Sequence, residues 1–436
     1  MNLEVHVLGR RVARLEAAGD FRSILTYEAG VAAEDFVSLT MPVREEAWEW
    51  DDPLHPVFRM NLPEGYLLHV LEERFGPHIG ASPAALLAVV GRNMVGRLQV
   101  APPGANLSEP VRPLDVKGLL QGDNSEKAFS QLVSEYATSG VSGVVPKFLD
   151  AEKSRVRLSQ YGQATLLSRR HIIKGSTRQL PYISLNEHFG MQVAGKVLPA
   201  ARTEISQDGQ ALVVHRFDTD EGGQPCRGLE DFCVLLGLRP AAKYETTWER
   251  IAKAVRDHVP IERRRQGFRQ LAGTILLTYA LRNADCHAKN VALLYTSRED
   301  AQVAPVFDML TTCVYPGYQD SPPGIAFMGK KTWLPGKNLE KFLVSIFGVE
   351  QRDQAQMVEQ ISDAIAEVAP LVRQSMKEHP GFRDLGKRML AAWKEGVSAL
   401  RGKTMYGLPG WKAGEAFQGF SDPPKLKTPR KIIGKD

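Results

Sequence analysis

The chain has few cysteines, and their placement argues against the usual cysteine-based sites. Four occur among the 436 residues, and no two form a CxxC pair. Such wide spacing disfavours both a structural zinc site and a disulfide framework. We interpret Cys286, which lies in a polar stretch of interest, as a small residue in a tight loop rather than a nucleophile. The four are Cys226, Cys233, Cys286 and Cys313.

Long apolar runs and a strong charge of one sign are also missing. No apolar run reaches the roughly 18 residues of a membrane-spanning helix, and the N-terminus lacks the basic and apolar regions of a signal peptide. We therefore expect a cytoplasmic protein without membrane contact. The net charge of +5 permits contact with nucleic acid without requiring it. A length of 436 residues, 43% of them hydrophobic, predicts two or three domains with a sizeable core.

One polar stretch, residues 283–290, lies between two apolar segments. Apolar residues recur at helical spacing over residues 268–279, and residues 291–295 have the pattern of a buried strand. Polar residues mounted between buried elements are a frequent place for catalytic groups. Asp285, Asn290 and the later Asp308 are the set that a phosphotransferase needs. One carboxylate accepts the proton of the substrate hydroxyl, while an amide oxygen and a second carboxylate bind Mg²⁺.

Residues 285–290, together with Phe307-Asp308, resemble the catalytic core of the HipA family, the serine/threonine kinase toxins of toxin–antitoxin pairs. Further matches extend the resemblance over nearly all of the chain. It implies an α+β, two-lobed, protein-kinase-like fold. We expect a β-rich N-terminal subdomain over residues 1–105, a kinase-like N-lobe with a Gly-rich loop and hinge over 106–220, and a helical C-lobe with the catalytic and metal-binding residues over 221–436.

The resemblance implies a role for each polar residue of the catalytic stretch. Asp285 is expected to orient and deprotonate the substrate hydroxyl, and Asn290 and Asp308 are expected to bind Mg²⁺. Lys289 is expected to stabilise the charge that develops on the transferred phosphoryl group. His287 is expected to pin the loop by hydrogen bonding, because Asp285 already fills the role of base.

A glycine-containing stretch at residues 137–147 is not a Walker A loop. Its glycines could let backbone N–H groups approach phosphate oxygens, although a plain turn explains them equally well. HipA-like kinases carry a Gly-rich loop that ends in lysine and autophosphorylate a serine in it. This implies nucleotide contacts from Ser142, Gly143, Val144 and Lys147. The usual serine position holds a glycine here, so we expect autophosphorylation at Ser142, with Ser139 less favoured and no site as a third alternative.

Lys174 ends a short strand-like run and matches the family's Ile-Ile-Lys. The resemblance implies that it holds the α- and β-phosphates of ATP. Ser184 and Glu187, at the start of the next apolar-periodic helix, form a capping-box pattern. Glu187 could instead pair with Lys174, as a helix glutamate does in protein kinases. Of these two readings we favour the cap.

Residues 211–218 have the pattern of a buried strand that ends in polar residues. They resemble the Arg-Phe-Asp hinge of the family, whose backbone pairs with the adenine edge. We therefore expect a nucleotide-binding hinge of His215, Arg216, Phe217 and Asp218. Within it, the His215 carbonyl and the Phe217 amide would bind adenine, and Asp218 would lie near the ribose.

The N-terminal region shows a hairpin and a family signature. Alternating apolar residues over 3–15, interrupted at Gly9, predict a β-hairpin. Residues 58–65 predict a helix start, with Pro63 near the first turn and Glu64 at the positive end of the helix dipole. The same run resembles a signature of the HipA N-terminal subdomain, where it helps to form the surface that faces the antitoxin.

The function implied by the resemblance is an ATP- and Mg²⁺-dependent serine/threonine protein kinase that acts as a toxin. An aminoacyl-tRNA synthetase is the expected substrate. A helix-turn-helix antitoxin is the expected partner and would bring the complex to operator DNA, since this chain has no evident DNA-reading motif. Two alternatives remain open from the residues: a catalytically silent scaffold that acts through its antitoxin, and a small-molecule kinase on the same fold.

Overall fold

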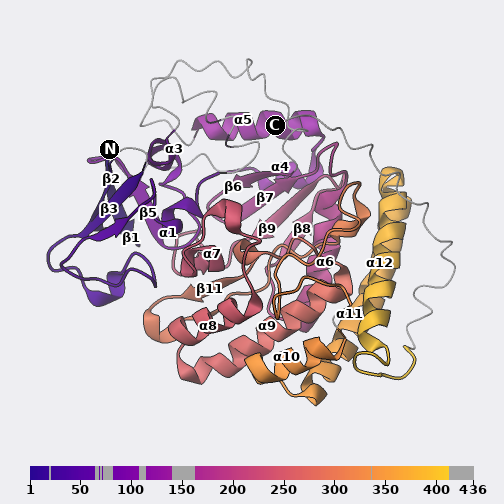
Figure 1. The fold of residues 1–436 in the computed structure, drawn as a ribbon. Coiled ribbons are helices and arrows are strands. Elements are labelled where there is room, and N and C mark those ends of the chain that lie inside the picture. The colour runs from indigo at the N-terminus through magenta and orange to yellow at the C-terminus, as the bar shows by residue number, and fades with distance from the viewer. Residues whose placement is uncertain are drawn as a thin grey trace, which may run out of the picture.

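The computed structural model describes residues 1–18, 21–63, 82–107, 114–139, 163–334 and 336–411, with two single residues, Leu68 and Leu71, between these ranges. Its described strands form three sheets. Figure 1 shows a β-rich N-terminal module on one side, a second sheet in the upper middle, and a mostly helical region below and to the right.

The N-terminal module is an antiparallel sheet in the order β4-β3-β2-β1-β5. Leu8 and Gly9, between β1 and β2, have φ angles of 49° and 78°, and two left-handed residues are typical of tight hairpin turns. The predicted hairpin is thus confirmed. The strands are β1 Asn2–Val7, β2 Arg10–Ala18, β3 Arg22–Tyr27, β4 Trp48–Trp50 and β5 Leu98–Ala101.

Two short helices, α1 (Pro56–Arg59) and α3 (Pro83–Val90), pack against this sheet. Phe58, placed by the sequence just before a helix start, lies inside α1 instead. The helix begins at Pro56 because a proline fits the first helical turn and the His55 side chain accepts a hydrogen bond from Val57 N. Most of the predicted helix that starts near residue 63 falls outside the described residues.

The second sheet has the strand order β6-β7-β9-β8 and helices on both faces. Side chains of β9 alternate between two cores, with Val213 facing Phe129 of α5 and Leu212 facing Phe189 of α6. Gly175 permits the close approach of α5, since a Cβ there would lie 2.6 Å from the Phe129 ring. The elements are α4 Val116–Gln121, α5 Glu126–Ser139, β6 Ala164–Leu167, β7 His171–Gly175, α6 Ile183–Val197, β8 Thr203–Ile205 and β9 Ala211–His215.

The third sheet, β10-β11-β12, lies within the helical region. Its elements are β10 Gly228–Asp231, α7 Phe232–Leu235, α8 Trp248–His258, α9 Ile261–Leu281, β11 Ala292–Tyr295, β12 Gln302–Val303, α10 Lys337–Phe347, α11 Gln351–Glu378 and α12 Arg383–Arg401. Short 3-10 turns lie at Ala33–Asp35, Pro240–Ala242, Ala288–Asn290, Arg298–Asp300, Thr312–Val314 and Pro380–Phe382.

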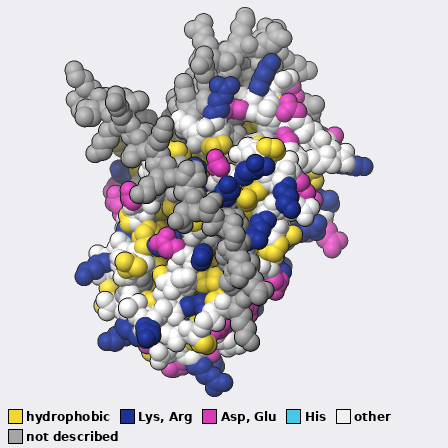
Figure 2. Space-filling model, turned by 90° about the vertical axis from the view of Figure 1, so that its right-hand side faces the viewer, with side chains coloured by type: hydrophobic (Ala, Val, Ile, Leu, Met, Phe, Trp, Pro, Cys, Tyr) yellow, Lys and Arg dark blue, Asp and Glu magenta, His cyan; other side chains and the backbone are white. Residues whose placement is uncertain are grey.

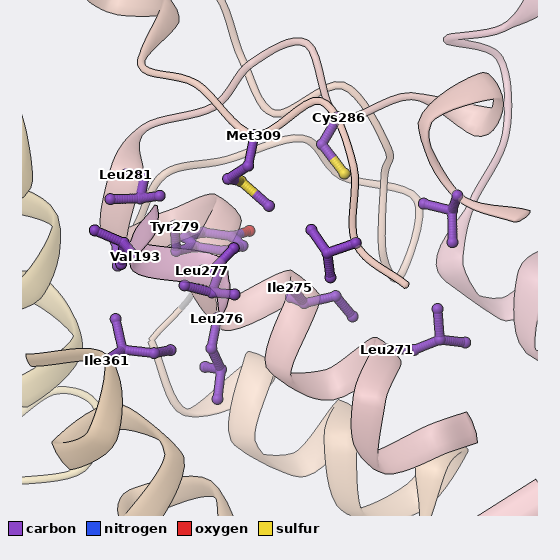
Figure 3. Packing of buried hydrophobic residues seen from close by; sticks show 14 of the residues in the cluster. Val193, Leu271, Ile275, Leu276, Leu277, Tyr279, Leu281, Cys286, Met309 and Ile361 are labelled. Carbon is purple, nitrogen blue, oxygen red and sulfur yellow. The ribbon is translucent and has the colours of Figure 1, made fainter. Parts of the chain in front are cut away.

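Helix α9 is the central core element of this region. Its residues from Gln270 to Leu281 are all buried, which confirms the predicted apolar helix. Figure 3 shows α9 side chains in one cluster with Cys286 and Met309, which belong to the loops that carry the candidate site residues. The hydrophobic core therefore fixes these loops relative to each other.

Two buried polar contacts join the N-terminal module to the rest of the chain. Glu230, fully buried, accepts hydrogen bonds from Ser38 Oγ at 2.6 Å, from Leu39 N at 2.8 Å and from the Tyr295 hydroxyl. Arg97 donates to the carbonyls of Thr296 and Phe36 at 2.8 Å each. Buried hydrogen bonds of this kind favour one arrangement of the elements they join.

The outer surface is slightly basic. Figure 2 shows the face that lies to the right in Figure 1, with Lys and Arg side chains spread over it from the upper half to the lower edge. This agrees with the net charge of +5. Among the described residues, no helix combines the length and the apolar character needed to cross a membrane.

Candidate active site

The candidate catalytic loop, residues 283–290, begins where α9 ends. Arg282 closes the helix in the left-handed conformation, with a φ of 56°. Thr312, from the segment after Asp308, holds both sides of this turn: its hydroxyl donates to Arg282 O at 2.9 Å and accepts from Ala284 N at 2.8 Å. The start of the loop is therefore attached to a second, distant segment.

Hydrogen bonds link the three residues that were predicted to do the chemistry. The buried Asn283 side chain accepts from Asp285 N at 3.0 Å and donates to Asp308 O at 3.4 Å. Asn290 Nδ2 donates to Asp285 O at 2.9 Å. The structure thus brings Asp285, Asn290 and Asp308 to one place, and their spacing depends on Asn283.

The Asp285 carboxylate is 41% exposed and accepts a hydrogen bond from the Tyr244 hydroxyl. Burial and the negative charge of Asp308 raise the pKa of Asp285, while the Tyr244 hydrogen bond acts in the opposite direction. A raised pKa makes a carboxylate a better proton acceptor. Tyr244 is thus a hydroxyl donor to the Asp285 carboxylate in this structure.

His287 and Cys286 are buried and uncharged. Burial and the nearby Lys243 lower the pKa of His287 to about 3, and its Nε2 lies 3.8 Å from Asp285 Oδ1. The His287 ring packs edge-on against Tyr244 at 5.0 Å. The expected pinning by hydrogen bonding is not seen, because the buried Nδ1 has no hydrogen-bond partner among the described residues and Nε2 is too far from Asp285 for a hydrogen bond. Burial raises the pKa of the Cys286 thiol to about 12, so this thiol is not an activated nucleophile.

Lys174 lies between two carboxylates. Its Nζ is 2.7 Å from Glu187 Oε1 and 2.5 Å from Asp308 Oδ1. The Glu187 side chain is 1% exposed, and the other two are 14% and 21% exposed. Burial and the Asp308 charge raise the pKa of Glu187 to about 7, whereas Lys174 holds the pKa of Asp308 below its usual value. The ammonium therefore offsets the repulsion between two enclosed acids.

The predicted capping box at Ser184 and Glu187 is wrong. Helix α6 begins at Ile183 after Tyr182, so Ser184 lies inside the first turn rather than at the cap. The Ser184 hydroxyl donates to Gln210 O at 2.8 Å. Glu187 lies one turn further along and faces β7, where it pairs with Lys174. The alternative that the sequence left open is the one that the structure contains.

Asp308 has a left-handed backbone, with a φ of 62°. Non-glycine residues in this region are uncommon and gather at functional sites. Its carboxylate and the side-chain oxygen of Asn290, whose Nδ2 already donates to Asp285 O, are the donor types that Mg²⁺ prefers. The two residues fit a Mg²⁺ ion held largely by phosphate oxygens and water, because Mg²⁺ usually takes only one or two carboxylates from the protein.

The hinge residues fall into two groups. Phe217 packs against Phe307, the residue before Asp308, with ring centroids 6.1 Å apart. Arg216 and Asp218 form a buried ion pair, with side chains 1% and 2% exposed, and Asp218 accepts from Gly96 N at 2.7 Å. The Asp218 carboxylate was expected near a ribose. The structure instead places it in the contact with the N-terminal module, where Arg216 and Gly96 satisfy it.

Lys289 lies close enough to Asp231 for its charge to counteract the burial that raises the pKa of Asp231 to about 6. Ser139 is the last residue of α5. Residues 140–147, which contain Ser142, Gly143, Val144 and Lys147, lie outside the described residues.

Comparison with known families now identifies the chain. The HipA-like C-terminal domain matches residues 139–370, and the HipA N-terminal domain matches residues 3–101. The chain belongs to the HipA family. The α+β, two-lobed fold expected from the sequence is confirmed.

Individual relatives of this HipA family member agree with that assignment. Two proteins of Sinorhizobium fredii, named "Putative kinase Y4mE" and "Putative kinase Y4dM", are 29% and 25% identical over 68% and 72% of this chain, and 73% and 78% of their own length. One chain in the solved complex of HipA, HipB and operator DNA from the Shewanella oneidensis MR-1 toxin–antitoxin system matches with a TM-score of 0.65. That match has 16% identity and covers 95% of this HipA chain and 99% of the other, so it shows the fold.

Three residues of this HipA site were missed or misjudged from the sequence: Glu187, Tyr244 and Asn283. Asn283 lies two residues before Asp285 in the same polar stretch, and this position is the sequence signal that could have found it. Tyr244 is 41 residues before Asp285, and no local pattern links the two.

Proposed function

We propose that this HipA chain is an ATP- and Mg²⁺-dependent serine/threonine protein kinase and the toxin of a toxin–antitoxin pair. The main support is the separation of two sets of groups. Lys174 joins Glu187 and Asp308, which suits nucleotide phosphates, whereas Asp285 accepts a hydrogen bond from a hydroxyl, which suits an acceptor alcohol. The kinase names of two relatives add to this support.

In the proposed reaction, Lys174 holds the phosphates of ATP. Asn290 and Asp308 would hold Mg²⁺, which would supply neutralisation of the phosphate charge. Asp285 aligns the acceptor hydroxyl and takes its proton as the new O–P bond forms, and the bond from the γ-phosphorus to the bridging oxygen breaks to release ADP. Lys289 stabilises charge on the transferred group.

The resemblance to HipA adds two further parts to the proposal. Ser142, Gly143, Val144 and Lys147 contact the phosphates, and the chain autophosphorylates Ser142. A phosphate there adds about −1.5 to −2 charges beside the nucleotide phosphates, and this repulsion opposes ATP binding. At the hinge, the backbone of residues 215–217 binds adenine.

The proposed partners follow from the same family membership. The similar solved complex contains HipA, HipB and operator DNA, so we propose a helix-turn-helix antitoxin that links this chain to its operator. The proposed substrate is an aminoacyl-tRNA synthetase, whose phosphorylation would stop tRNA charging in the cytoplasm.

Binding of Mg-ATP to the full chain tests the proposed function. At Mg-ATP about 100 times its Kd, the free energy of unfolding should rise by about 2.7 kcal/mol, and thermal unfolding with and without EDTA would measure this rise. The variant Asp308→Asn should lose the Mg²⁺-dependent part. Absence of any stabilisation of the wild type at millimolar Mg-ATP would favour the silent scaffold.

The pH dependence of phosphoryl transfer should respond to Tyr244. A base must be deprotonated, so activity falls as the pH drops through the pKa of Asp285. Tyr244→Phe removes a hydrogen bond that lowers this pKa in the enzyme without substrate. The acid limb of the kcat/KM profile, which reports the free enzyme, should therefore move to higher pH. Tyr318→Phe leaves that hydrogen bond in place and should not move the limb. An acid limb in Tyr244→Phe that coincides with the wild type would contradict the assigned role.

A further inference from the structure

A cavity of about 430 Å³ opens beside the catalytic aspartate. Its size lies within the range of about 300–1,000 Å³ that is typical of ligand sites. Its lining includes Asp285 and Tyr244, together with residues at the start of α6 and in the segment of residues 310–331. None of the roles proposed for ATP or Mg²⁺ accounts for this space.

The cavity lies on the acceptor side of Asp285. Asp285 lines it, whereas Lys174 and Asp308, the groups that suit the phosphates, do not. A molecule whose hydroxyl replaces the Tyr244 hydroxyl at Asp285 would therefore extend into this cavity rather than toward the nucleotide.

The walls of the cavity are mostly apolar. Leu180, Ile183, Leu310 and the prolines 322 and 323 line it together with three tyrosines. Among the described lining residues, the charged ones are Asp285 and Lys331, and Lys331 Nζ already donates to Tyr244 O at 2.8 Å. A highly polar metabolite would lose hydrogen bonds to water that few groups in the cavity could replace, which makes its binding unfavourable. An apolar side chain leaves water on entering the cavity, which is favourable.

One wall is attached closely to the catalytic loop. A Cβ at Gly324 would lie 2.4 Å from Cys286 O and 2.9 Å from Ala284 O, so only glycine allows this approach. The wall next to Gly324 therefore stands at a fixed place relative to Asp285. Tyr318, which also lines the cavity, is 49% exposed, and aromatic side chains are enriched at protein contact surfaces.

We propose that this cavity binds a bulky apolar side chain of a polypeptide acceptor, close in sequence to the serine or threonine that Asp285 activates. This inference rests on the proposed kinase function and adds the chemistry that selects the acceptor. The fixed wall sets the separation between the apolar side chain and the hydroxyl, which makes the neighbouring residue a determinant of the rate.

Short synthetic peptides with a single serine test the inference, with the flanking residues changed in turn to Gly, Glu, Leu and Phe. The full chain is incubated with γ-labelled ATP and Mg²⁺, and label transfer is compared with ATP hydrolysis in the absence of peptide. One flanking position should prefer Leu or Phe over Gly by at least about tenfold in kcat/KM, the discrimination expected of a hydrophobic pocket.

Two cavity variants should reduce that preference. Ser321→Phe fills the cavity and Tyr318→Ala removes part of its wall, and both should raise the KM for the preferred peptide while ATP hydrolysis changes less than about twofold. Ser345→Phe makes the same substitution as the filling variant, at an exposed site on α10, and should leave the preference unchanged.

Three results would overturn the inference. The first is equal transfer to all peptides, and the second is an unchanged preference in both cavity variants. The third is transfer to hydroxyl-bearing metabolites instead of peptides, which would make the cavity a small-molecule site. Absence of both Mg-ATP stabilisation and ATP hydrolysis is a separate outcome, because it refutes the kinase function itself.

Discussion

Replacing Asp285 with Asn is expected to lower the rate of phosphoryl transfer from γ-labelled ATP by about 10²- to 10⁴-fold, the usual contribution of a positioned general base. The amide keeps the shape of the carboxylate and can still accept from Tyr244, but it cannot take a proton. Because Lys174 and Asp308 remain in place, Mg-ATP should stabilise the variant as it does the wild type.

The matched control is Asp320→Asn, an exposed aspartate on the segment that follows Asp308. It should transfer label at the wild-type rate. Transfer by Asp285→Asn within a factor of a few of the wild type would show that another group accepts the proton. Parallel loss of Mg-ATP stabilisation in Asp285→Asn would instead show that the substitution disturbs the nucleotide site.

Replacing Lys174 with Met should have the largest effect on stability. The change leaves the carboxylates of Glu187 and Asp308 enclosed together without the ammonium that lies 2.7 and 2.5 Å from them. Removing one partner of a buried ion pair typically costs about 3–5 kcal/mol. We expect a loss of this size in the free energy of unfolding, measured by denaturant titration without nucleotide, together with loss of Mg-ATP binding.

Lys196→Met provides the comparison for this variant. Lys196 pairs with Glu367 at 2.6 Å, but the two side chains are 43% and 63% exposed, and exposed pairs contribute about 0–1 kcal/mol. The double variant Lys174→Met, Glu187→Gln should recover part of the lost stability, because it removes one of the two unpaired charges. If Lys174→Met costs no more than Lys196→Met, the ammonium does not balance the two acids.

Much of the site could be predicted because its residues are close in sequence or follow a pattern. Asp285 and Asn290 are five residues apart in one loop, and the apolar spacing over residues 268–279 reveals the helix that carries it. The hairpin of β1 and β2 follows from alternation and a glycine turn. These local patterns predict the structure correctly because the local conformational preferences of the residues agree with the tertiary packing.

The remaining features depend on contacts between distant segments. A serine followed three residues later by glutamate predicts a capping box. The same pattern also occurs when the glutamate pairs with a lysine on a neighbouring strand, so the sequence does not distinguish the two. Only the packing of α6 against β7 decides that Glu187 pairs with Lys174. In the same way, the sequence around Asp218 gives no sign that the backbone N–H of Gly96, 122 residues earlier, donates a hydrogen bond to its carboxylate.

The buried joint between the N-terminal module and the hinge has a consequence for dissecting the chain. A fragment that starts after β5 would lose Gly96 N and Met94 O, which are partners of Asp218 and Arg216, and also the hydroxyl of Ser38, a partner of Glu230. Asp218, Arg216 and Glu230 would then each lack a hydrogen-bond partner. Each of these side chains that stayed buried would lower the free energy of unfolding by about 1–3 kcal/mol. Truncation at the boundary between the two segments that match separate family domains would therefore remove partners of the hinge along with the module.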